Sequence, residues 1–144
     1  MQTDARLSRM LHLLIHMGGS ERPLTSKDAA AMLQTNAVVV RRMMAGLREA
    51  GHVTSVKGHG GGWRLARPLA EITMLDIYRA LGEPRLFLIG PAKEQPECLV
   101  EQEVNASLES AFGEARALLL ARLEDVSLAQ IAEGFEKRFA ALGR

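Results

Sequence analysis

Residues 24–66 read LTSKDAAAMLQTNAVVVRRMMAGLREAGHVTSVKGHGGGWRLA. A Thr-x-x-Asp pattern that begins at Thr25 is typical of a helix start, because the hydroxyl accepts from an otherwise unpaired backbone amide. Asn36 is a favourable N-cap for a second helix over residues 37–50, and Gly51 is a favourable residue to end it. This stretch therefore predicts two consecutive helices joined by a tight turn.

A short hairpin is expected directly after these helices. Residues 52–56 and 63–66 have the pattern of strands, and the six residues between them, KGHGGG, form a flexible tip. Two helices followed by a basic hairpin are the arrangement of a winged helix-turn-helix. We predict a mainly α fold with a small β-hairpin, in which a long C-terminal dimerisation helix follows the winged helix-turn-helix.

The rest of the chain adds helices and one long loop. Apolar spacing and capping patterns predict further helices over residues 4–17, 73–82, 99–124 and from Ser127 onward. Residues 83–98 contain three prolines and one glycine, which favours a loop. The expected organisation is a DNA-binding domain over 1–82, an effector or sensor loop over 83–98 and a helical dimerisation region over 99–144.

Charge is distributed unevenly along the chain. Residues 1–68 carry ten lysines and arginines against four acids, a balance of +6, whereas residues 69–144 carry eight against thirteen, a balance of −5. This asymmetry favours a polyanion partner for the first half, the alternative being an unevenly charged solvated surface.

Targeting and redox features are few. The single cysteine excludes an intrachain disulfide, no apolar run approaches the ~20 residues that span a bilayer, and no signal-peptide pattern is present. We expect a cytoplasmic protein without a membrane partner.

The second helix and the hairpin supply the candidate DNA-binding residues. The start of such a helix faces base edges in the major groove, where arginine can bind guanine and an apolar side chain can touch a thymine methyl. Glycines at the hairpin tip allow close approach to phosphates. The candidates are Thr25, Ser26, Asn36, Val38, Val39, Arg41, Arg42, Lys57, Gly58, His59 and Arg64. The alternative is that the arginines only solvate an outer face.

No catalytic pattern is found, so we do not expect an enzyme. The glycine-rich tip lacks the lysine, hydroxyl and following helix of a phosphate-binding loop. His12 and His16 share a helix face and could form a metal pair, but no third ligand is evident, so a helix surface is favoured and no metal is expected. His52 and His59 lie in the hairpin and are expected to face DNA.

With these residues placed, the chain resembles the Rrf-two family of winged helix-turn-helix repressors, the group of IscR, NsrR and CymR. It is most similar to the YwnA-like branch of that family. The strongest matches are LREAGHV at residues 47–53 and SVKGHGGGWRLARP at residues 55–68. Residues 72–80 and 126–131 fit the next helix and the last helix of the family.

The resemblance implies a homodimeric repressor that binds double-stranded DNA at a palindromic operator. It implies that Val38, Val39 and Arg41 read bases, that Lys57 enters the minor groove and that Arg6 approaches the DNA backbone. Family members that carry an iron–sulfur cluster hold it with three cysteines in the loop before the long helix. This chain has one there, so we expect no cluster and no other cofactor.

The long helix and its first residues carry two further predictions. Its apolar stripe exceeds what a small domain needs to cover, and we predict a dimer interface at Leu108, Phe112, Ala115, Leu119 and Leu123. Cys98 is a candidate redox sensor, modified by a small thiol or oxidant, the alternative being an inert packed residue. A small effector of unknown identity could bind the loop instead. The alternative function is a winged-helix protein interaction module that does not bind DNA.

Overall fold

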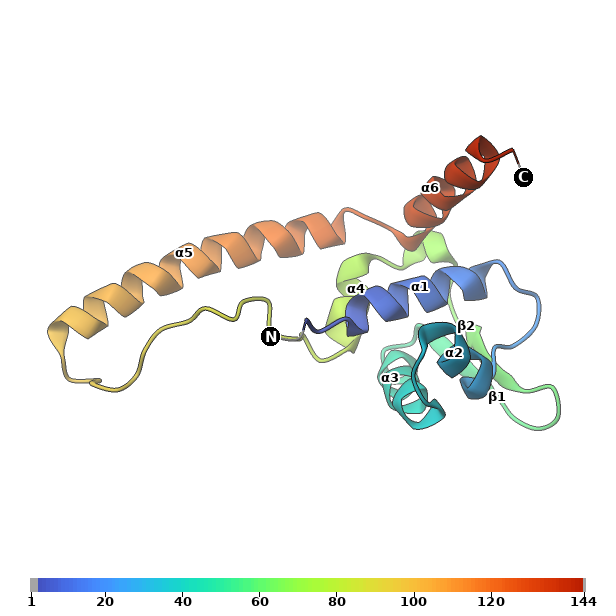
Figure 1. The fold of residues 1–144 in the computed structure, drawn as a ribbon, viewed down its shortest axis with the longest axis horizontal. Coiled ribbons are helices and arrows are strands. Elements are labelled where there is room, and N and C mark those ends of the chain that lie inside the picture. The colour runs from blue at the N-terminus through green and yellow to red at the C-terminus, as the bar shows by residue number, and fades with distance from the viewer. Residues whose placement is uncertain (1–2, 144) are drawn as a thin grey trace. The chain divides into compact units, whose positions relative to one another are not determined.

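The computed structural model describes residues 3–143 and contains, within them, six α-helices, one short 3₁₀ helix and one two-stranded antiparallel sheet (Figure 1). The elements are α1 (Arg6–Gly18), α2 (Ser26–Leu33), α3 (Ala37–Glu49), β1 (Val53–Val56), β2 (Gly62–Leu65), η1 (Leu69–Glu71), α4 (Met74–Ala80), α5 (Leu99–Glu124) and α6 (Leu128–Ala141). The predicted fold class is confirmed. The chain forms two compact units, residues 3–84 together with 124–143, and residues 85–123.

Side-chain caps explain where several helices begin. The Asn36 side chain accepts from the Val39 amide at 3.0 Å, as predicted for the start of α3. Thr73 and Ser127 each form a complete capping box with the residue three positions later. At α2 the Thr25 hydroxyl accepts from the Asp28 amide at 3.0 Å, which is the hydroxyl half of the predicted box.

The core of the first unit is formed mainly by α1 and α3. The predicted buried stripe of α3 is confirmed, because Val40, Met43, Met44 and Leu47 are all buried. On α1 the buried residues are Met10, Leu13, Leu14 and Met17. Leu7 and Leu11, which the helical spacing also placed on the apolar face, are only partly buried at its edge. The face that α1 turns to the core is therefore rotated from the one that its spacing suggested.

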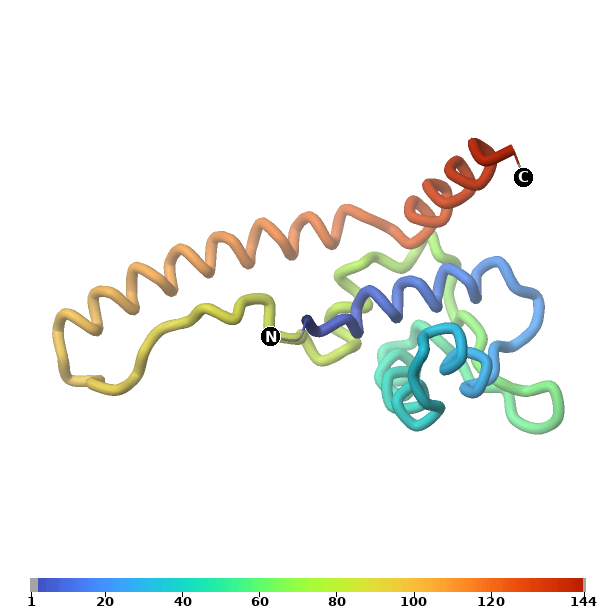
Figure 2. The backbone as a smooth tube through the Cα atoms, in the orientation of Figure 1, coloured from blue at the N-terminus to red at the C-terminus, as the bar shows by residue number. Residues whose placement is uncertain are grey.

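The C-terminal segment returns to the first unit, as the backbone trace in Figure 2 shows. Backbone hydrogen bonds run from Met74 N to Val126 O at 3.0 Å and from Leu128 N to Ile72 O at 2.8 Å. α6 then lies beside α1 and η1. The sequence grouped residues 128–141 with a dimerisation region, whereas here they pack with the winged helix-turn-helix.

η1 was not expected from the sequence. It spans only Leu69–Glu71, directly after Pro68, and three residues are too short to show a helical period. It carries the chain from the hairpin to the fully buried Ile72.

The second unit is a loop that lies along α5. Asn105 Nδ2 donates to Ala92 O at 2.7 Å, and Gln102 Nε2 donates to Pro96 O at 3.0 Å. The rings of Phe87 and Phe112 stack with centroids 5.4 Å apart. Among the described residues, no helix has both the length and the apolar character needed to cross a membrane.

Candidate nucleic-acid interface

The turn between α2 and α3 sets the direction of α3. Gln34 ends α2 in the left-handed region at φ 55°, and Thr35 N donates back to Ala30 O at 2.9 Å. At the other end of α3, a Cβ built on Gly46 would lie 2.8 Å from the Ala80 carbonyl oxygen, so α3 and α4 approach closely only because this residue is glycine. The turn thus sets the start of α3, and Gly46 allows α3 to pack closely on α4.

One face of α3 remains outside this packing. Val38 is 53% exposed, and Arg41 and Arg42 are exposed beside it. Val39 differs from its neighbours, because it is partly buried against the core. The Arg41 Nε donates to Ala37 O at 3.5 Å, so this side chain lies along its own helix and still has its terminal nitrogens available.

Arg6 lies near the same face but already has a partner. Its guanidinium donates to the Asp4 carboxylate at 2.7 Å, and this hydrogen bond raises the pKa of Arg6 and lowers that of Asp4. Arg6 and Arg42 both line a small cleft of about 250 Å³ between α1, α3 and α4. A phosphate bound here would have to compete with Asp4 for Arg6.

The wing, defined as residues 53–65, is fastened to the start of α2 through Trp63. The indole Nε1 donates to the Ser26 Oγ at 3.0 Å, and the backbone of Trp63 exchanges two hydrogen bonds with Leu24 at 2.8 and 2.9 Å. Gly62 permits this approach, since its Cβ would lie 2.6 Å from the Leu24 oxygen and its φ is +148°. The orientation of the wing relative to the helices is therefore fixed by packing.

The end of α3 also contacts the wing. The Arg48 guanidinium lies 5.9 Å from the centroid of the Trp63 ring, within range of a cation–π interaction. The sequence identified Trp63 only as the start of a strand. The only tryptophan of the chain, placed in a short hairpin, is the signal that could have indicated this anchor.

The basic residues of the wing lie at its tip and on its outer side. Lys57, Gly58 and His59 are exposed at the tip. Arg64 is exposed and pairs across the hairpin with Thr54. The base of the wing shares one core with α3 through Val53 and Trp63. The exposed basic and apolar residues of α3 and of the wing tip are named here the α3–wing surface: Val38, Arg41, Arg42, Lys57 and His59.

His52 does not belong to this surface, which corrects the expectation that it faces DNA. It is only 5% exposed, its amide donates to Leu47 O at 2.9 Å, and its carbonyl accepts from Ala66 N at 2.9 Å. Its Nδ1 is buried without a hydrogen-bond partner. Burial lowers the pKa of His52, so this residue is a neutral structural part of the base of the hairpin.

Two cations that the sequence did not single out gather behind the wing. Arg22 and Arg67 line, together with Arg64, a cavity of about 460 Å³ that also borders Trp63. The only sequence signal for them was the excess of basic residues in the first 68 positions. They extend the positive charge of the first unit beyond the α3–wing surface.

In the second unit, the predicted dimer residues differ in exposure. Leu123 is buried, Leu108 and Phe112 are half-buried, and Ala115 and Leu119 are exposed. Phe112 packs on Phe87 of its own loop. The exposure of Leu118 on the same helix is higher, at 75%.

Cys98 lies at the start of α5 and is partly buried. Its amide donates to Gln95 O at 2.9 Å, and its carbonyl accepts from Gln102 N at 3.0 Å. The backbone of this residue is therefore ordered by the first turn of the helix.

The model of the Rrf2 (Rrf-two) family, described as iron-dependent transcriptional regulators, matches residues 3–134. This description implies bound iron, which would need donor side chains such as cysteine, histidine or carboxylates. Cys98 is the only cysteine of the sequence, and within residues 3–143 no group of three or more His, Cys, Asp or Glu is placed to hold a metal ion. These donors do not fit a cluster held by three cysteines of one chain.

Individual relatives agree with the family match. YwnA of Bacillus subtilis, which bears the name of a helix-turn-helix transcriptional regulator, is 28% identical over 128 residues, covering 89% of this chain and 95% of its own length. The protein rrf2 of Nitratidesulfovibrio vulgaris is 29% identical over 129 residues, covering 90% and 84%.

Solved structures of low identity show the same fold. IscR of T. potens superposes with a TM-score of 0.68 at 22% identity, covering 96% of this chain and 90% of its own. CymR of B. subtilis superposes with a TM-score of 0.65 at 21% identity, covering 92% and 97%. The relatives are transcriptional regulators, which confirms the prediction that the chain is not an enzyme. The chain belongs to the Rrf2 family of winged-helix transcriptional regulators.

Proposed function

We propose that this protein is a dimeric, sequence-specific DNA-binding repressor that carries no iron–sulfur cluster. The observation that carries the proposal is the α3–wing surface, where α3 exposes two arginines and the hairpin that exposes Lys57 and His59 is anchored at its base to the same core. An arrangement of this kind can place α3 in a major groove and the wing tip against the adjacent backbone or minor groove.

The two parts of the surface have different chemical roles in this proposal. Arg41 can bind guanine through two hydrogen bonds, and the exposed methyls of Val38 can contact thymine. Lys57 supplies charge to the phosphates near the wing tip, which contributes affinity without reading sequence. Arg22 and Arg67 add positive charge beside the wing.

The test is a binding experiment on genomic fragments, beginning with the promoter of the protein's own gene. Footprinting identifies the operator, and titrations at several salt concentrations should show affinity falling by roughly 0.9 log units per log unit of salt for each phosphate neutralised. Arg41→Ala should reduce the difference in binding free energy between the operator and a site with a substituted guanine by about 1–3 kcal/mol. Lys57→Ala should weaken binding to all sequences.

The matched control is Arg138→Ala, which removes an exposed arginine from α6. It should leave both affinity and discrimination unchanged. Tight specific binding that survives both Arg41→Ala and Lys57→Ala would contradict the assignment of this surface. Absence of specific binding to any fragment would favour a protein interaction module instead.

Dimerisation is proposed from apolar residues that the single chain leaves uncovered. Val104 is 51% exposed and Leu118 75% on α5, and Phe135 is 57% exposed on α6. A two-fold dimer would bury such residues and would fit a palindromic operator with half-sites about one helical turn apart. Leu118→Asp is the cleaner test, because Phe112 also packs on its own loop. Sedimentation should show a dimer for the unmodified protein and a monomer for Leu118→Asp.

Cys98 is proposed as the redox-responsive residue. Thiolate attack on a small disulfide forms a mixed disulfide at Cys98 Sγ and releases the second half as a thiolate. The added group at the start of α5 would displace the two DNA-binding units of a dimer relative to their half-sites. DNA affinity should fall on disulfide treatment of the unmodified protein and stay constant in Cys98→Ser. Equal affinity in all samples would leave Cys98 a structural residue.

A further inference from the structure

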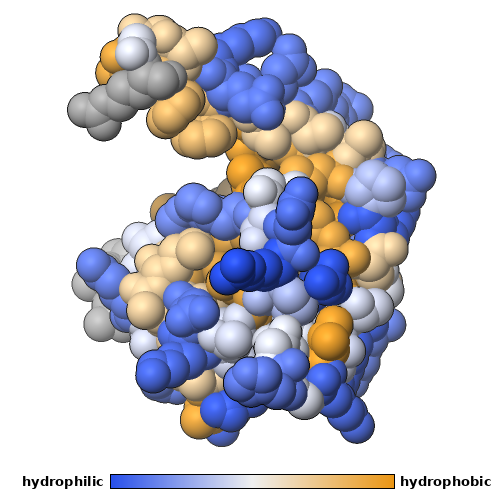
Figure 3. Space-filling view, turned by 90° about the vertical axis from the view of Figure 1, so that its right-hand side faces the viewer, coloured by the Kyte–Doolittle hydropathy of each residue, from blue (hydrophilic) through white to orange (hydrophobic). Residues whose placement is uncertain are grey.

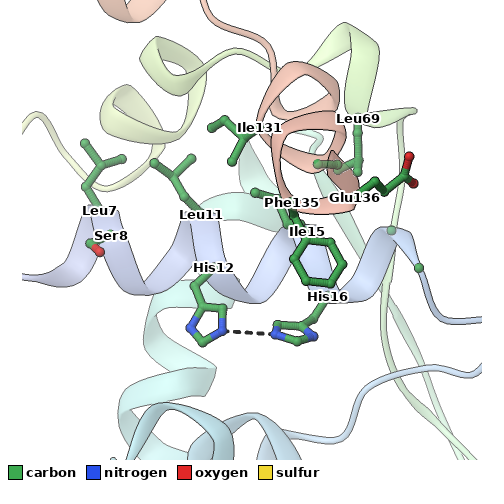
Figure 4. Close-up of a pocket in the computed structure, with 13 residues that line it drawn as sticks. Leu7, Ser8, Leu11, His12, Ile15, His16, Leu69, Ile131, Phe135 and Glu136 are labelled. Carbon is green, nitrogen blue, oxygen red and sulfur yellow. Dashed lines mark hydrogen bonds between the residues drawn. The ribbon is translucent and has the colours of Figure 1, made fainter. Parts of the chain in front are cut away.

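Two imidazoles meet on α1, away from the α3–wing surface. His12 and His16 lie one helical turn apart, and both side chains are exposed. Their Nε2 atoms are 3.0 Å from each other, and the ring centroids lie 4.8 Å apart with the planes tilted by 56° (Figure 4). Neither ring packs into the core, and a hydrogen bond between the two Nε2 atoms holds the rings together.

The separation of these atoms matches the requirement of a shared metal ion. Imidazole nitrogens bind Zn²⁺ at about 2.0–2.1 Å. Two such bonds to atoms 3.0 Å apart enclose an angle of about 95°, close to the ~90° of octahedral or tetragonal coordination. A small rotation of either ring would open it towards the tetrahedral value. An ion that displaces the proton of this hydrogen bond can therefore be reached by both nitrogens through rotation of the side chains, without any change of the helix.

The surroundings leave room for the rest of a coordination shell. The pair lies at the rim of a cavity of about 870 Å³ between α1 and α6, which contains Glu136 among mostly apolar residues. Figure 4 shows Leu11 on the side of α1 that faces Ile131 of α6, while the two imidazoles project from the opposite edge of α1. In Figure 3 hydrophobic surface occupies the hollow beside α6, with hydrophilic residues around it. Water can reach the ring nitrogens from the open side.

We propose that His12 and His16 form a two-ligand site for a divalent transition-metal ion of the Zn²⁺ type, with water completing the shell. The site uses neither Cys98 nor any residue of the loop that precedes α5. A bound ion links two successive turns of α1, the helix that supplies Met10, Leu13, Leu14 and Met17 to the core. Because the ligands converge only when α1 is helical, the ion stabilises the folded first unit.

The test uses Zn²⁺ alone, which has no geometric preference from d electrons and does not oxidise a thiol. All samples carry Cys98→Ser, so that no thiolate competes for the ion. Long-range ¹H–¹⁵N spectra of the four histidines should show the Nε2 resonances of both His12 and His16 shifting together and saturating at one ion per chain. The melting temperature should rise over the same titration.

His12→Gln and His16→Gln remove one ligand each from an exposed position. Loss of a hydrogen-bond partner behind a metal ligand already costs about 10–100-fold in metal affinity, so loss of a ligand itself should cost at least as much. Either variant should also abolish the Zn²⁺-dependent rise in melting temperature. Glu21→Gln, which neutralises an exposed side chain outside the proposed sites, should bind Zn²⁺ and melt as the parent does. A shift at only one of the two rings, saturation that survives either substitution, or no saturable shift would overturn the proposal and leave the pair as a hydrogen bond between surface rings.

Discussion

The two units of this protein contain similar kinds of residues but bury them very differently. In the first unit, side chains from α1, α2, α3, the wing and α6 form one enclosed cluster, in which Leu14, Val40 and Leu47 have no exposed surface. In the second unit, α5 has 26 residues, of which only Leu123 is buried. The first unit thus encloses a core of its own, whereas apolar residues of α5 such as Val104 and Leu118 stay exposed in the single chain.

The loop over residues 85–98 covers only part of α5. It is held on α5 mainly by hydrogen bonds from Gln102 and Asn105 to loop carbonyls and by the Phe87–Phe112 ring contact. These contacts order the loop but leave Val104 and Leu118 exposed. In the proposed dimer, a second copy of the chain would cover these exposed residues.

The largest difference should appear when one leucine is truncated in each unit. Leu14→Ala creates a cavity in the enclosed core and should lower the free energy of unfolding by about 2–5 kcal/mol in urea titrations. Leu118→Ala, at an exposed position of α5, should change it by less than about 0.5 kcal/mol in dilute protein that is monomeric. A comparable loss at Leu118 under those conditions would show that the two units do not differ as described.

Glycine substitutions should have opposite effects in the two units. A Cβ on Gly46 would lie 2.8 Å from the Ala80 oxygen, so Gly46→Ala should destabilise the first unit by about 1–3 kcal/mol. A Cβ on Gly113 in α5 would meet no atom within 4 Å, so Gly113→Ala should stabilise the helix by up to about 1 kcal/mol. Thermal unfolding of both variants measures this. Destabilisation by Gly113→Ala would indicate close packing of another chain on this face of α5.

Removal of the wing anchor should have a smaller effect. Ser26→Ala leaves the Trp63 Nε1 without its acceptor and should cost about 1 kcal/mol. Trp63 is the only tryptophan, so its fluorescence reports directly on the anchor, and emission should shift to longer wavelength. Ser55→Ala, at the exposed residue paired with Trp63 across the hairpin, is the matched control. An unchanged spectrum in Ser26→Ala would mean that packing alone holds the indole.

The smallest effect concerns pH. Burial lowers the pKa of His52 below its ordinary value of about 6.5, nearby Asp76 opposes this change and Arg67 reinforces it. The unfolded chain therefore binds more protons than the folded chain in mild acid, and the contribution of His52 to stability is complete above about pH 6.5 and declines as the pH falls below it. Unfolding titrations between about pH 5 and 7.5 should show a weaker pH dependence in His52→Gln than in the parent. His59→Gln should keep the dependence of the parent, and equal slopes for all three proteins would contradict this role of His52.

Local signals in the sequence were sufficient for the helix starts and for the buried face of α3. Asn36, Thr73 and Ser127 cap their helices through bonds that span three residues, so a short segment contains all the information needed. The basic first half and the glycine-rich hairpin likewise identified the winged helix-turn-helix and, through the resemblance, the Rrf2 family. The arginines of α3 were found because a helix with one apolar face must expose the other.

The tertiary structure decided which residues of similar chemistry have which role. His52 and His59 are seven positions apart in the same hairpin, yet one is enclosed and the other is exposed at the tip. Trp63 meets Ser26 across 37 positions, and no local pattern connects them. The sequence by itself determined the α-helices, the hairpin and the sign of the charge they carry, because these depend on neighbouring residues. The anchor of the wing, the burial of His52 and the uncovered face of α5 depend on which distant side chains come together in three dimensions, and only the fold determines that.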